Sequence, residues 1–113
     1  FQLVHAIRPS SRRRHFQLVQ AIRPSSRRTP VLSPPKLGKP FTVETDASIR
    51  AIAGCLLQKG KEENLHPIAY FSRKLNKHEK RYAVVELEAL AIVAALKNFR
   101  PYLEGASEVH CYY

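Results

Sequence analysis

The clearest alternation of apolar and polar residues in this chain begins at residue 41. The stretch Phe41-Thr-Val-Glu-Thr-Asp-Ala-Ser48 alternates the two kinds of side chain and is rich in residues that favour extended backbone. This pattern predicts a short, half-buried strand over 41–47. We expect its last inward position to be Asp46, where a carboxylate is costly unless water, a metal ion or a partner group receives it. Asp46 is therefore the first candidate for chemistry.

Two more apolar runs follow, and both have the length of strands. Ala51–Gln58 contains Gly54, which suits a bulge or a close backbone contact, and Leu65–Arg73 has Pro67 near its start. A polar stretch over 59–64 separates the two runs and reads as a hairpin loop. Three strands joined by short connections predict an antiparallel meander.

The next part of the chain changes to a helical pattern. Asn76 and Glu79 have the spacing of a capping box, and Ala83–Phe99 is rich in Ala and Leu without a helix breaker. The Arg-Pro step at 100–101 ends this helix, residues 102–105 form a turn, and Ser107–Tyr113 forms a last strand. A strand that follows a helical crossover lies parallel to an earlier strand, so we expect a mixed α/β sheet with the last strand parallel to the first.

The first 40 residues follow neither pattern. Residues 1–13 recur as residues 16–28 with 12 of 13 positions identical, and the difference is His5 against Gln20. A period of 15 residues is not that of a solenoid, so we expect residues 1–28 to be disordered or to form short helices. Residues 29–40 hold four prolines and read as a linker, which leaves 41–113 as the globular domain.

Charge supports this division. The chain carries a formal net charge of +10, yet residues 41–113 hold ten basic and nine acidic residues, so the excess lies in the N-terminal arm. Three interpretations of the arm stay open. It is a solvated extension without a role, a nucleic-acid-binding arm in which Arg12, Arg13, Arg27 and Arg28 neutralise phosphates, or a mitochondrial transit peptide.

Other compositional features narrow the classes of protein. Cys55 and Cys111 make no metal-binding spacing with His pairs and read as free, half-buried thiols of a reducing compartment, which places the chain in the cytoplasm or nucleus. Apolar runs are too short for a membrane helix, so we expect no membrane partner. The chain has no Met, which indicates a processed N-terminus or part of a longer reading frame.

A helical carboxylate could join Asp46. Glu86 and Glu88 lie about 200° apart around the helix, so one of them at most faces the sheet, and the periodicity does not choose between them. Two carboxylates from separate elements would suit Mg²⁺. In the alternative interpretation Asp46 caps a turn and Glu88 faces solvent.

Residues 39–110 resemble the ribonuclease H-like domain of reverse transcriptases from gypsy-type LTR retrotransposons. The resemblance rests on Lys39-Pro-Phe and Thr45-Asp-Ala-Ser, on Gly54 and Gln58, on His66-Pro-Ile-Ala-Tyr with Ser72-Arg-Lys-Leu, and on the run from Glu79 to Gly105. It implies a ribonuclease H-like fold that is truncated at its C-terminus. It also implies a parent polyprotein whose domain hydrolyses the RNA strand of RNA–DNA hybrids with two Mg²⁺ or Mn²⁺ ions.

The resemblance also implies roles for particular residues. Asp46 matches the first catalytic aspartate and Glu88 the catalytic helix glutamate, so both would be metal ligands. Tyr112 stands where the family has its third catalytic aspartate, and a fourth carboxylate would lie beyond residue 113. With two of four carboxylates missing, we expect weak or no metal binding and no activity from this chain alone.

The resemblance further implies two partners, an RNA–DNA hybrid or other nucleic acid and the remainder of the polyprotein. Arg73 and Lys74 are candidate phosphate contacts. The alternative function is a noncatalytic nucleic-acid-binding module that uses the basic arm.

Overall fold

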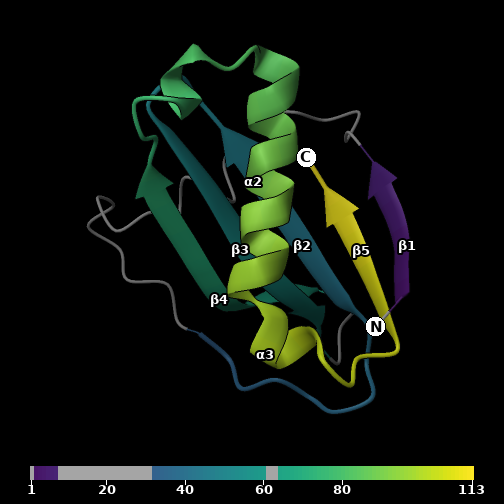
Figure 1. Cartoon of the computed structure of the whole chain (residues 1–113). Helices are drawn as coiled ribbons and strands as arrows, with labels where there is room; N and C mark the ends of the chain where they lie inside the picture. The colour runs from purple at the N-terminus through teal and green to yellow at the C-terminus, as the bar shows by residue number, and fades with distance from the viewer. Residues whose placement is uncertain (1, 8–31, 61–63) are drawn as a thin grey trace.

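A five-stranded mixed sheet in the order β1-β5-β2-β3-β4 forms the body of the molecule, and helix α2 crosses one face of it (Figure 1). The structure is a computed structural model that describes residues 2–7, 32–60 and 64–113. The strands are β1 (Gln2–Ile7), β2 (Phe41–Ala47), β3 (Ala51–Lys59), β4 (Leu65–Lys74) and β5 (Glu108–Tyr112). The helices are η1 (Glu79–Arg81, a 3₁₀ turn), α2 (Val84–Asn98) and α3 (Arg100–Leu103).

The predicted meander is confirmed. Strands β2, β3 and β4 pair antiparallel in sequence order, with Asp46 opposite Ala53. The β2–β3 connection is held by Ser48, whose amide donates to the carbonyl of Ala51 at 2.9 Å while its Oγ accepts from the amide of Ala51 at 3.1 Å. Side-chain bonds of this kind close tight turns, so a serine directly after the strand fixes the meander's first corner.

The predicted crossover is confirmed as well. After α2 the chain returns as β5, which pairs parallel to β2 with Phe41 opposite Val109 and Glu44 opposite Tyr112. Strand β5 therefore lies inside the sheet, between β1 and β2 (Figure 1). The fold is the mixed α/β sheet that the sequence predicts, extended by one strand.

The added strand corrects the prediction for the N-terminal repeat. Residues Gln2–Ile7 form a strand that pairs parallel with β5, not the helical turns or disorder that we expected. The apolar residues of this stretch fit either a helix or a strand, and pairing with a distant strand decides between them. The rest of the repeat, including its second copy, lies outside the described residues.

Helix α2 packs closely on the sheet because β3 has a glycine beneath it. A Cβ atom at Gly54 would lie 2.6 Å from Cε1 of Phe71 and 3.1 Å from Cβ of Ala95. The ring of Phe71 in turn meets Phe99 edge-on, with centroids 5.7 Å apart. Ala95 is fully buried, so the Gly54–Ala95 contact sets how near the helix lies to the strands.

The helix ends near its predicted position, but the turn after it is helical. Phe99 closes α2 and opens the four-residue helix α3, with Pro101 near the N-terminus of the new helix. Proline fits there because the first amides of a helix have no partner within it. The expected plain turn over 102–105 is therefore wrong for its first residues, and Leu103 is fully buried in the core.

The described part of the Pro-rich linker is fastened to the sheet by one side chain. Gln58 is 3% exposed, and its Oε1 accepts from the amide of Lys36 at 2.7 Å while its Nε2 donates to the carbonyl of Lys36 at 2.8 Å. The same Nε2 lies 3.4 Å from the carbonyl of Lys39. A further bond runs from the amide of Ser33 to the carbonyl of Pro67 on β4, at 3.0 Å. The linker thus runs along the domain in a fixed path.

Candidate active-site edge

Three of the predicted site residues lie at one edge of the sheet, where β2 and β5 end and α2 begins (Figure 1). Asp46 is the sixth residue of β2, Tyr112 is the last of β5, and Glu88 lies in the second turn of α2. Parallel pairing makes β2 and β5 end at the same edge, and the helix runs back from it. The structure therefore brings together residues that are far apart in the sequence.

Asp46 does not face the helix, contrary to the inward position that we expected. Its neighbour Ala47 packs against the cluster that contains Leu87 and Ala91 of α2, and Thr45 is 1% exposed. Since side chains alternate along a strand, Asp46 lies on the face opposite α2, half-buried. A carboxylate on α2 can approach Asp46 only around the end of β2, because the helix lies on the other face of the sheet.

The two helical glutamates have different surroundings. Glu86 caps the helix, since its Oε1 accepts the amide of Ala83 at 3.0 Å, and it is exposed. Glu88 is half-buried and lies one turn before Ile92, which packs against the main core cluster over β2, β3, β4 and β5. Glu88 therefore lies beside the buried face of α2. The capping bond gives Glu86 a local role that the sequence pattern did not reveal.

Tyr112 lies on the same face of the sheet as Asp46, the face opposite α2. It pairs in register with Glu44, two positions before Asp46 on β2. Cys111, its neighbour, lies on the other face, buried in the core beneath α2 and α3. A phenol therefore occupies the end of β5 on this face of the sheet, half-buried.

The cysteines are free, as the sequence predicts, but they are fully buried and not half-buried as we expected. Burial raises the pKa of the Cys111 thiol to about 11. Burial and, to a smaller extent, the nearby Glu44 carboxylate raise the pKa of Cys55 well above its usual range. Neither thiol is a nucleophile near neutral pH.

The two candidate phosphate contacts lie at the same edge, on β4. Arg73 pairs with Ile52, which pairs with Ala47, so it lies two strands from the end of β2, about 10 Å away. Its guanidinium binds Glu79 through two bonds, from Nη1 to Oε1 at 2.7 Å and from Nη2 to Oε2 at 2.9 Å. Lys74 is exposed beside it. Arg12, Arg13, Arg27 and Arg28 lie outside the described residues.

Glu79 is the centre of a small polar cluster that the capping-box spacing predicted. Its Oε1 accepts the amide of Asn76, and its own amide donates to Oδ1 of Asn76, both at 2.9 Å. The bonds from Arg73 and Asn76 lower the pKa of Glu79 to about 2. This cluster joins the end of β4 to the 3₁₀ turn that leads into α2. Sequence reasoning found the Asn76 contact but missed the Arg73 contact.

The donor set at this edge suits a divalent cation only in part. Carboxylate oxygens are the ligands that Mg²⁺ prefers, and Asp46 and Glu88 supply two such groups. Within residues 2–7, 32–60 and 64–113, no cluster of three or more His, Cys, Asp or Glu side chains could hold a metal ion. The described residues therefore do not fit a two-ion centre, which needs more carboxylates than two.

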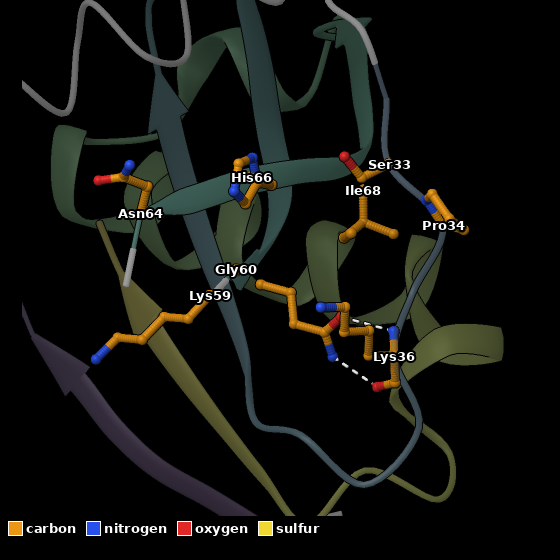
Figure 2. A pocket seen from close by; sticks show the side chains of 9 residues that line it. Ser33, Pro34, Lys36, Lys59, Gly60, Asn64, His66 and Ile68 are labelled. Carbon is orange, nitrogen blue, oxygen red and sulfur yellow. Dashed lines mark hydrogen bonds between the residues drawn. The ribbon is translucent and has the colours of Figure 1, made fainter. Parts of the chain in front are cut away.

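A cavity of about 440 Å³ lies at the opposite end of the sheet, between the linker and the β3–β4 hairpin (Figure 2). Gln58 contributes to its wall with the amide that fastens the linker. None of the predicted site residues in the described ranges lines it; the described lining residues are Ser33, Pro34, Lys36, Gln58, Lys59, Gly60, Asn64, His66 and Ile68. The candidate chemistry and this cavity are thus at opposite ends of the sheet.

The sheet order and crossover define a ribonuclease H-like fold, and comparison with known proteins supports this class. The structure superposes with a TM-score of 0.60 on a chain from a solved structure of the foamy viral protease-reverse transcriptase dRH in complex with double-stranded DNA. The match covers 85% of this chain and 17% of that chain at 18% sequence identity. At that identity the likeness concerns the fold alone.

Sequence relatives specify the family. A family profile for the RNase H-like domain found in reverse transcriptase matches residues 12–111, so the chain belongs to that family. It is 46% identical over 82 residues to the retrovirus-related Pol polyprotein from transposon opus and 47% identical over 76 residues to that from transposon 297, both of Drosophila melanogaster. It is also 39% identical over 83 residues to the transposon Tf2-3 polyprotein of Schizosaccharomyces pombe.

The aligned part is a small share of each relative. The matches cover 73%, 67% and 69% of this chain but 8%, 7% and 6% of the respective polyproteins. The relatives confirm the resemblance to retrotransposon reverse transcriptase polyproteins. Among the helices in the described ranges, none is long and apolar enough to cross a membrane.

Proposed function

We propose that this chain derives from the ribonuclease H part of a retrotransposon reverse transcriptase polyprotein, whose parent domain hydrolyses the RNA strand of RNA–DNA hybrids. The observation that supports the proposal is that Asp46 and the end of β5 lie at one edge of a ribonuclease H-like sheet, where α2, the helix that carries Glu88, begins. In this proposal Asp46 and Glu88 are the two remaining catalytic carboxylates and metal ligands. The remainder of the polyprotein is the natural partner.

Tyr112 decides the expected activity. A phenol has one oxygen where a carboxylate has two, so it cannot replace a carboxylate that bridges two cations. With Tyr112 at that position, Asp46 and Glu88 would hold at most one Mg²⁺ or Mn²⁺ ion weakly. We therefore expect no hybrid cleavage from this chain alone, because the attacking water and the leaving oxygen each need a cation.

The test is an RNA–DNA hybrid cleavage assay combined with Mn²⁺ titration of the full chain. The wild-type chain should leave the hybrid intact, and Asp46→Asn should abolish whatever weak Mn²⁺ binding it has. Tyr112→Asp should raise the Mn²⁺ affinity, whereas Tyr112→Phe, the matched control, should leave it unchanged. Metal-dependent cleavage by the wild-type chain that Asp46→Asn abolishes would refute the inactivity. Equal Mn²⁺ affinity in the Asp and Phe variants would refute the assignment of Tyr112.

A second candidate function is noncatalytic binding of nucleic acid. The excess of basic residues in positions 1–40 favours it, and Arg73 and Lys74 lie at the candidate edge. Phosphate contacts make binding fall steeply with salt. Hybrid binding that is insensitive to salt, or that survives replacement of Arg12, Arg13, Arg27 and Arg28 by Gln, would exclude a role for the arm.

A further inference from the structure

The outer edge of β5 takes a strand from outside the family domain. Strand β1 pairs with it in parallel, from Gln2 opposite Glu108 to Ile7 opposite Tyr112. The family match starts at residue 12, so β1 is not part of the matched domain. The edge of β5 is therefore a site for strand addition, filled here by the first copy of the N-terminal repeat.

The chain contains a second strand that suits this edge. Residues 17–22 read Gln-Leu-Val-Gln-Ala-Ile, and residues 2–7 read Gln-Leu-Val-His-Ala-Ile. The one difference exchanges polar His5 for polar Gln20. Strand pairing depends mainly on backbone bonds, which every non-proline residue can make, and on the alternation of side chains, which the sequences of the two copies share.

The second copy can also reach the edge, as the register of the sheet allows us to calculate. Ile7, Tyr112, Glu44, Cys55 and Tyr70 form one row across the five strands. Four strand spacings separate the two ends of this row by about 19 Å, and the three residues from Tyr70 back to Pro67 add about 10 Å along β4.

The point to be reached is Ser33, whose amide binds the carbonyl of Pro67. Ser33 lies about one strand spacing outside β4, so the direct distance to it from the end of a strand in the β1 position is about 26 Å. The eleven residues from Ile22 to Ser33 span about 36 Å when extended, which leaves about 10 Å for the path around the sheet. The linker is long enough for residues 17–22 to take the β1 position.

We propose that the β5 edge binds either copy of the repeat, so that residues 2–7 and residues 17–22 exchange as the outer strand of the sheet. The duplication then supplies two alternative edge strands for one site. In this proposal the copy that does not pair with β5 leaves the sheet together with the arginines that follow its Ser-Ser pair, which are Arg12, Arg13 and Arg14 in the first copy and Arg27 and Arg28 in the second.

Proline pairs in the full chain test the proposal. Neighbouring amides on a strand point to opposite sides, so two adjacent prolines remove one bond to β5 whatever the register. The first variant carries His5→Pro and Ala6→Pro, the second carries Gln20→Pro and Ala21→Pro, and the third combines all four. The readout is the hydrogen-exchange protection of those amides in Glu108–Tyr112 that point toward β1, because the alternate amides bond to β2 and stay protected. The amides of β3 are the internal control for folding.

Either proline pair alone should leave the protection of β5 at the wild-type level, and the combined variant should lose it. Loss of β5 protection in either single-pair variant, with β3 still protected, would overturn the proposal because one copy would be required. Full β5 protection in the combined variant would overturn it as well. If the combined variant fails to fold, the β5 protection of the two single-pair variants still tests whether one copy can replace the other.

Discussion

Gln58→Ala should destabilise the domain although Gln58 lies far from the candidate site. The side chain is 3% exposed and makes two short bonds to the backbone of Lys36, at 2.7 and 2.8 Å. Each such bond contributes about 1 kcal/mol net, and the truncation also leaves buried space. We expect a loss of about 2–3 kcal/mol in the free energy of unfolding.

A urea titration at 25 °C with a parallel thermal melt measures this loss. A domain of this size should melt about 10 °C lower, since 1 kcal/mol corresponds to about 4–8 °C. Lys36→Ala and Lys39→Ala are matched controls, because Gln58 binds their main-chain atoms and both side chains are exposed. A loss below about 0.5 kcal/mol in Gln58→Ala would refute the reasoning, as would an equal loss in Lys36→Ala.

Three further predictions concern the core and the polar cluster. The pKa of Glu79 is lowered to about 2 from an ordinary 4.5, so the stability that Glu79 adds over a Glu79→Gln variant should be full above pH 4.5 and should be lost as the pH falls to about 2. Thermal melts of both proteins across this pH range measure the difference in stability. A difference that does not change with pH would contradict the lowered pKa. Gly54→Ala should cost about 1–3 kcal/mol in urea unfolding, because the new Cβ would lie 2.6 Å from the ring of Phe71; an unchanged midpoint would contradict the close packing. Cys111, buried and with a pKa of about 11, should react with Ellman's reagent at pH 8 only after unfolding, and immediate reaction of the native chain would contradict its burial.

Local patterns predicted most of the domain. Phe41–Ala47 has the bounds that its alternation indicates, and Asn76 and Glu79 form the reciprocal bonds that their spacing indicates. The helix differs from its predicted bounds by one residue at each end. These features depend on neighbours within a few residues, so the sequence contains the information directly.

The features that the sequence did not reveal depend on distant partners. Gln58 binds a segment 22 residues away, and strand β1 is defined by its pairing with β5 near the other end of the chain. The inward orientation predicted for Asp46 was wrong because the alternation places Asp46 on the same face as Glu44, while Phe41 and Val43 form the face that packs under the helix. The choice of Glu88 over Glu86 came from family resemblance, and the capping role of Glu86 required coordinates.

The position of β5 inside the sheet, between β1 and β2, has a consequence for how the molecule folds. The meander and α2 involve contacts between near neighbours in the sequence and can form early. Strand β5 instead joins β2 across roughly 70 residues and β1 across roughly 100, and contacts of such long range slow folding. Docking of β5 should therefore be the late step, and until then β2 has an open edge to which another chain can add.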